Sequence, residues 1–126
     1  MSWQSDWAYN KYWVMAHSQN AYNEIRTLAK NNHWDEKKEQ EYQQIVQSLE
    51  NVEPTKATLV TAYQHIWGYF KKIATPEEKQ QYLKLLDYLS PENDNLGAFL
   101  TQLTDKYQVK YLQNSRIIIE IKEQNK

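Results

Sequence analysis

The stretch from Thr58 to Ala74 carries the apolar pattern that most constrains the fold of this chain. Large apolar side chains recur there every three or four residues, at Leu59, Tyr63, Ile66, Phe70 and Ile73. This spacing places them on one face of an α-helix. We therefore predict a helix over residues 58–74 that is buried along one side and lies at the centre of the molecule.

One of the chain's two glycines, Gly68, stands in the middle of this predicted helix. Glycine in a helix interior costs about 1 kcal/mol relative to alanine, so we expect its missing side chain to serve a purpose. The polar face around it bears Thr61, His65 and Lys72 at spacings of three or four residues. Two uses are open: another helix packs closely over Gly68, or an anion or a partner's backbone approaches it.

The rest of the chain shows shorter stretches with the same helical spacing. Its two glycines and three prolines favour helices joined by short connections. Ser18 and Asp35 are expected N-caps, and Thr75-Pro76 followed by Glu78 predicts a capping box. At 126 residues we expect one domain. The prediction is an all-α single domain, a compact bundle of six or seven helices around the helix over 58–74, with helices over 5–16, 18–30, 35–49, 76–89 and 95–107.

The pattern weakens after Tyr107. Tyr111 and Leu112 indicate a further short helix, whereas residues 116–121 (RIIIEI) are β-branched and compatible with an extended segment. No partner strand is identifiable, so we expect either a helix or a packed extended tail. Residues 123–126 are expected to be frayed.

The composition excludes several classes of chemistry. The absence of cysteine rules out disulfides, thiolate nucleophiles and cysteine-ligated iron–sulfur clusters. The N-terminus lacks the features of a signal peptide, and no stretch has the length and apolar character of a membrane span. We expect a cytoplasmic protein without a cofactor or a membrane partner. Because the net charge is −1, nucleic-acid binding would need a local basic patch.

The histidines are the residues to consider for catalysis. His17 and His65 meet in space only if the first and fourth predicted helices pack together. Convergence would let them act as acid and base, or as metal ligands with Glu24. The alternative, which we favour, is that each makes a structural hydrogen bond, so we expect no catalytic residue and no metal ligand.

Aromatic residues are abundant, with five tryptophans and ten tyrosines. Most fall on helical stripes and are expected to fill the core. Two segments mix aromatic rings with lysines, residues 9–13 (YNKYW) and 106–111 (KYQVKY). That combination suits unpaired RNA bases and phosphates, although it also occurs on ordinary helix rims. The Lys71-Lys72 pair is likewise explained by its place at a helix C-terminus.

Two segments, 11–18 (KYWVMAHS) and 64–71 (QHIWGYFK), resemble the two signature segments of the YbgA-like family, a domain of unknown function. The resemblance covers roughly residues 7–115. Members of that family stand alone or are fused to a thiouracil desulfidase domain. In the fused proteins the YbgA-like part is thought to hold thiolated RNA, while an iron–sulfur site in the other domain performs the chemistry.

The resemblance implies a non-catalytic accessory domain that binds RNA or tRNA and acts with a desulfidase, repair enzyme or other nucleic-acid-processing partner. The lysines would contact phosphate, and the histidines and tyrosine would contact a base or hold the motif together. With Lys72 added, the implied RNA-binding residues are Lys11, His17, Ser18, His65, Gly68, Tyr69, Lys71 and Lys72. Leu59, Thr61 and residues 90–95 depart from the family's pattern. If the residues that they replace contact RNA, this chain has lost or changed that RNA binding.

Two other functions stay open. A protein–protein docking module without RNA binding predicts an exposed apolar patch of several hundred Å². A small enzyme predicts His17 and His65 converging in a pocket. RNA binding predicts instead that Lys11, Lys71 and Lys72 share a positive, concave surface.

Overall fold

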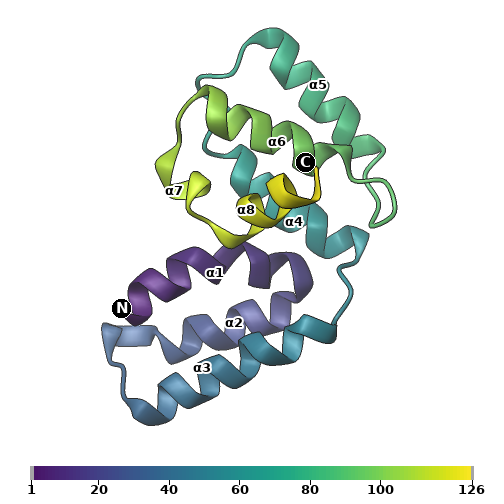
Figure 1. The fold of residues 1–126 in the computed structure, drawn as a ribbon. Helices are drawn as coiled ribbons and strands as arrows, with labels where there is room; N and C mark the ends of the chain where they lie inside the picture. The colour runs from purple at the N-terminus through teal and green to yellow at the C-terminus, as the bar shows by residue number, and fades with distance from the viewer. Residues whose placement is uncertain (1, 126) are drawn as a thin grey trace.

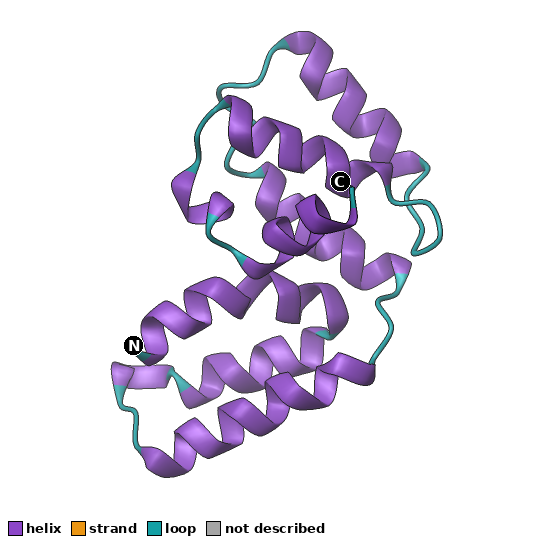
Figure 2. Cartoon of the chain, viewed as in Figure 1, coloured by secondary structure: helices purple, strands orange, loops and turns teal. Residues whose placement is uncertain are grey.

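The computed structural model describes residues 2–125, which form eight α-helices and two short 3-10 helices with no strand among them (Figure 1, Figure 2). This confirms the all-α prediction. Six of the helices correspond to the six stretches with clear apolar spacing. The other two lie in the C-terminal part of the chain, after Tyr107, where the apolar spacing is weakest. The helices are α1 (Trp3–His17), α2 (Gln19–Leu28), α3 (Glu36–Ser48), α4 (Lys56–Trp67), α5 (Pro76–Asp87), α6 (Asn95–Lys106), α7 (Lys110–Gln113) and α8 (Arg116–Gln124), with 3-10 helices at Lys30–Asn32 and Leu49–Asn51.

Helices α1 and α6 each pack against several other helices and so hold the bundle together. Helix α1 packs against α2, α4 and α8, and α6 packs against α4, α5, α7 and α8 (Figure 1). Helices α2 and α3 lie side by side beyond α1, and α5 lies on the far side of α6. The most deeply buried apolar side chains include Val14, Ala62, Ile66, Phe70, Leu96, Leu100, Leu112 and Ile118. Within residues 2–125, no helix is both long enough and apolar enough to cross a membrane.

The predicted caps at Ser18, Asp35 and Thr75 are confirmed, whereas the helices predicted to start at residues 5 and 58 each start two residues earlier. Ser18 accepts a hydrogen bond from the amide of Ala21 (3.0 Å), and Asp35 accepts one from the amide of Lys38 (2.8 Å). Thr75 and Glu78 form a reciprocal capping box with Pro76 at the first turn of α5. These signals lie within four residues of one another, so local sequence is sufficient to find them.

The predicted helix over 58–74 is wrong at its C-terminal end, because α4 ends at Trp67 and residues 68–74 form irregular turns. The amides of Phe70 and Lys71 both bond to the carbonyl of Trp67 (2.8 and 3.1 Å). This breaks the regular four-residue pattern of an α-helix. As a result Phe70 is fully buried, whereas Ile73, which the stripe assigned to the core, is 53% exposed.

Within residues 2–125 no helix packs over Gly68, so the packing explanation for this glycine is wrong. Gly68 is the exposed C-cap of α4, and a side chain there would meet within 4 Å only the helix's own carbonyls. The close approach occurs instead at the other glycine, Gly97 in α6.

The C-terminal segment is helical rather than extended. Ile117 and Ile118 are buried, and α8 packs against both α1 and α6. A helix satisfies its own backbone hydrogen bonds, whereas a lone strand would leave them unpaired. Residues 123 and 124, expected to be frayed, belong to α8, while residue 126 lies outside the described residues.

Candidate functional site

An open groove of about 450 Å³ lies between the end of α4, the turn that follows it and α5. Six side chains line it: Trp67, Lys71, Lys72, Lys79, Tyr82 and Leu83. Three of the six are lysines and two are aromatic. The groove therefore combines positive charge with flat apolar surface.

The local fold explains how these residues meet. The turn over 68–74 separates α4 from α5, whose capping box begins at Thr75, and the contact between Trp67 and Tyr82 places α5 beside the end of α4. Lys79 and Tyr82 stand three residues apart on α5 and so share a face. The rings of Trp67 and Tyr82 stack in parallel, with centroids 4.2 Å apart and planes 6° apart. Burial raises the pKa of Tyr82, which keeps its phenol neutral.

The three lysines of the groove have no acidic partner. Across residues 2–125, no carboxylate oxygen lies within 4.0 Å of the ammonium of Lys71, Lys72 or Lys79. By contrast, Lys106 and Lys122 each pair with a carboxylate, at 2.6 and 2.8 Å. The groove thus keeps a positive field that attracts anions.

A second cluster, which we call the tyrosine cluster, joins Tyr12 of α1, Tyr69 of the turn and Tyr111 of α7. The hydroxyls of Tyr12 and Tyr69 lie 2.9 Å apart, and the rings of Tyr69 and Tyr111 stack at 6.0 Å. Burial and the Tyr69 hydroxyl raise the pKa of Tyr12. The ammonium of Lys11 lies 5.6 Å from the Tyr12 ring centroid. Lys11 and Tyr69 therefore belong to this cluster and do not line the groove.

The two histidines bond to their own helices. Nδ1 of His17 lies 2.7 Å from the carbonyl of Trp13, and Nδ1 of His65 lies 2.8 Å from the carbonyl of Thr61. A carbonyl only accepts, so each Nδ1 carries the proton and donates. Helices α1 and α4 do pack together, but no hydrogen bond or ring contact in residues 2–125 joins the histidines.

The same region offers no metal site. In the described part of the chain, no group of three or more histidine or acidic side chains could hold a metal ion. Ser18, adjacent to His17, is occupied as the N-cap of α2. The geometry therefore favours structural roles for His17, Ser18 and His65.

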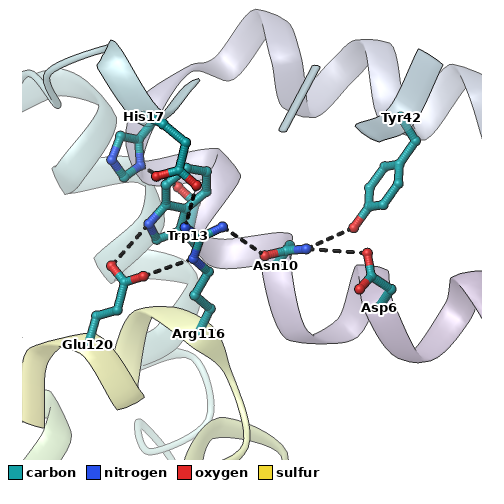
Figure 3. A network of polar contacts seen from close by, with 8 residues as sticks. Asp6, Asn10, Trp13, His17, Tyr42, Arg116 and Glu120 are labelled. Carbon is teal, nitrogen blue, oxygen red and sulfur yellow. Dashed lines mark hydrogen bonds and ion pairs between the residues drawn. The ribbon is translucent and has the colours of Figure 1, made fainter. Parts of the chain in front are cut away.

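A polar network that the sequence did not predict centres on Arg116 of α8 (Figure 3). Its guanidinium lies 3.7 Å from the Trp13 ring centroid and bonds to the carboxylates of Glu120 (2.8 Å) and Glu50 (2.7 Å). It also donates to the side-chain oxygen of Asn10 (3.2 Å). The indole of Trp13 donates to Glu120 (3.2 Å). Arg116 thereby holds α8 against α1.

Asn10 extends this network to α3. Its side-chain amide donates to the hydroxyl of Tyr42 (3.0 Å) and to Asp6 (3.4 Å) (Figure 3). Burial raises the pKa of Tyr42, so its hydroxyl stays neutral. Asn10 and Arg116 are 106 residues apart, which is why no local sequence signal reveals the contact.

We expect Arg116→Lys to lower the free energy of unfolding by about 1 kcal/mol, because a lysine cannot reproduce the forked hydrogen bonds or the stacking on Trp13. Urea denaturation at neutral pH measures this. Arg26→Lys is the matched control, since Arg26 is exposed and forms no ion pair within residues 2–125. Equal losses in the two variants would contradict the structural role of Arg116.

Most of the chain matches a known protein family. Residues 11–120 match the family described as "Protein of unknown function (DUF1722)". The chain belongs to this family. The DUF1722 match contains the groove and the tyrosine cluster entirely, together with Arg116 and Trp13. Comparisons with curated proteins and with solved structures give no match.

All eight residues predicted for RNA binding lie within the DUF1722 match, and the structure distributes them over three places. Lys71 and Lys72 line the groove, Lys11 and Tyr69 belong to the tyrosine cluster, and the other four lie at helix ends, namely His17, Ser18, His65 and Gly68. The prediction missed Lys79 and Tyr82 as partners of the two groove lysines. The available signal was the helix start at Thr75, so soon after the lysines, because short connections place consecutive helices of a bundle beside each other.

Proposed function

We propose that this chain is a non-catalytic accessory domain that binds RNA in the groove. The observation that supports it most is the arrangement of three lysines without acidic partners around the stacked Trp67 and Tyr82. Ammonium groups attract phosphates, and aromatic rings stack with bases. A domain of net charge −1 can bind an anionic polymer only where positive charge is concentrated, and the groove concentrates it.

We further propose that the DUF1722 family of this chain is the YbgA-like family. The matched residues, 11–120, span both segments on which the resemblance rests. The domain would then act in the cytoplasm with a desulfidase or another nucleic-acid-processing enzyme as its partner. In that arrangement this chain holds the RNA and the partner supplies the chemistry.

A protein docking module is the second candidate. Ile73, Leu83 and Tyr88 are 53%, 59% and 68% exposed, which gives the region around α5 an unusual amount of apolar surface. The enzyme hypothesis gains no support, because the histidine side chains are bonded to their own helices.

A titration with tRNA at two salt concentrations tests RNA binding. Three phosphate contacts predict that affinity falls about 20- to 40-fold between about 50 and 200 mM salt, since each contributes about 0.7 to 0.9 to the logarithmic slope. Lys71→Glu/Lys72→Glu should weaken binding at least about tenfold at the lower salt. Lys37→Glu/Lys56→Glu makes the same change in charge at exposed positions outside the groove. Absence of binding, or equal losses in both double variants, would contradict the proposal.

A further inference from the structure

We infer that the groove accepts an unpaired nucleotide, with its base stacked against Trp67, and so selects single-stranded over duplex nucleic acid without reading the base sequence. This inference rests on the proposed function and deepens it. Three features of the groove carry it: the aromatic stack, the placing of the lysines and the chemistry of the lining side chains.

The aromatic stack provides a surface that only an unpaired base can use. Tyr82 is 5% exposed and lies parallel to Trp67, so it fixes the indole plane, while Trp67 stays partly exposed in the groove. Bases inside a duplex are already stacked on both sides and offer no free face. A single strand can turn one base towards an aromatic ring at little cost.

The lysines of the groove come from two different elements of the fold. Lys71 and Lys72 come from the turn after α4, and Lys79 comes from α5. A base that enters the groove between this turn and α5 has a phosphate on each side along its own strand. The groove can therefore bind a base and its neighbouring phosphates at once, as single-strand binding sites do.

Apart from the lysines, which can favour guanine, the lining side chains give no means to tell one base from another, and none to tell uracil from cytosine. Discrimination relies on paired donors and acceptors such as those of asparagine, glutamine or the carboxylates. None of these types is among Trp67, Lys71, Lys72, Lys79, Tyr82 and Leu83. Lysine donates to any acceptor, so we expect sequence-tolerant binding.

A second basic hollow provides a useful contrast. It is lined by Asn23, Arg26 and Thr27 of α2 and by Lys30 of the 3-10 helix that follows. It has two cationic side chains, as strong a pair as Lys71 and Lys72, but no aromatic residue in its lining. The groove has one cationic side chain more, but the main difference is that the groove alone of these two places offers aromatic rings for base stacking.

Fluorescence anisotropy with labelled oligonucleotides tests the inference. We use oligouridine and oligocytidine of about 12 nucleotides, within the usual site size, and a blunt RNA duplex of the same length. We expect the single strands to bind at least about tenfold more tightly than the duplex and within about threefold of each other. Lys71→Glu/Lys72→Glu should reduce single-strand binding at least about tenfold, and Arg26→Glu/Lys30→Glu should leave it within about twofold.

The role of Trp67 is tested directly. Trp67→Ala should weaken single-strand binding about tenfold and leave any duplex binding unchanged. Because this variant also loses the stack on Tyr82, a second measurement uses Trp67→Phe. Oligouridine should quench tryptophan emission in the wild type and quench it much less in Trp67→Phe. Equal quenching in the two proteins would overturn the stacking.

The outcomes separate this inference from the proposed function. Duplex binding as tight as single-strand binding, still dependent on Lys71 and Lys72, would overturn the inference and leave RNA binding intact. A preference of more than about tenfold for one base would overturn sequence tolerance alone. No binding of any oligonucleotide or of tRNA would overturn both proposals.

Discussion

Glu78→Gln is expected to lower the free energy of unfolding by about 2 kcal/mol at neutral pH, the usual magnitude for hydrogen bonds to a charged group. One carboxylate oxygen of Glu78 accepts from the ammonium of Lys106 (2.6 Å). The other accepts from the hydroxyl of Tyr107 (2.6 Å) and the amide of Thr75 (2.9 Å). An uncharged amide attracts Lys106 less strongly and cannot satisfy all three donors.

The effect should depend on pH in a defined direction. The hydrogen bonds from Lys106 and Tyr107 lower the pKa of Glu78 to about 2, from an ordinary value of 4.5. A carboxyl with a lowered pKa stabilises the fold fully above its unfolded pKa and loses that contribution as pH falls through the folded pKa. The difference between wild type and Glu78→Gln should therefore shrink between about pH 5 and about pH 2.

Urea denaturation of both proteins at neutral pH and at about pH 3 measures this change. Glu77→Gln is the matched control, because Glu77 is the exposed neighbour in the same first turn of α5 and has no ion pair within residues 2–125. It should change stability by less than about 0.5 kcal/mol. A difference for Glu78→Gln that is as large at about pH 3 as at neutral pH would contradict the argument.

Glu78 also illustrates what can be predicted from sequence. Its capping-box role is visible locally, because Thr75 lies three residues away. Its bonds to Lys106 and Tyr107 span 28 and 29 residues and depend on how α5 packs against α6. Helix starts are therefore predictable, whereas the contacts that hold one helix against another are not.

The end of α4 shows a different limit. Phe70 is fully buried although it lies in the turn after α4, so the apolar spacing persists past the true helix end. Gly68 was the one local sign of that end, but the prediction kept it inside the helix, with helix packing or the approach of an anion or a partner's backbone as its purpose. The periodicity therefore located the buried Phe70, but it gave neither the end of the helix nor the exposure of Ile73.

The candidate site was predicted in part for the same reason. Lys71 and Lys72 attract attention from their place in the sequence, and the structure does put them in the groove. Tyr82 was assigned to the core, and it is indeed 5% exposed, but its stacking on Trp67 makes it part of the groove as well. A residue that serves both purposes cannot be distinguished from an ordinary core residue by spacing alone.

Gly97→Ala is expected to lower the free energy of unfolding by about 2 to 3 kcal/mol, through overpacking. A side-chain carbon at Gly97 would lie 2.7 Å from the hydroxyl of Tyr63 and 3.1 Å from a methyl carbon of Ile121. The hydroxyl is not free to move away, because it donates to Asp94. Asp94 in turn accepts from the amide of Gly97 (2.8 Å) as the N-cap of α6. Relieving the clash therefore breaks either the hydrogen bond from Tyr63 to Asp94 or the cap.

Gly68→Ala is the matched control for this substitution. Gly68 has helical angles (φ −53°, ψ −25°), so alanine fits its backbone conformation. An added carbon would lie 3.1 Å from the carbonyl of His65, a contact that a small backbone shift can relieve, and no other helix is near. Alanine's helix propensity offsets that cost. We expect a change of less than about 0.5 kcal/mol, measured by thermal and urea denaturation alongside Gly97→Ala.

The double variant Gly97→Ala/Tyr63→Phe decides whether the Tyr63 hydroxyl is the cause. Tyr63→Phe alone removes the bond to Asp94, and should cost about 1 kcal/mol. In the double variant the Tyr63 hydroxyl, the atom closest to the added carbon, is absent. The loss of stability measured for the double variant should therefore be smaller than the sum of the losses of the two single variants. A coupling near zero would mean that Ile121 or the cap at Asp94, rather than the hydroxyl, makes glycine necessary at this position.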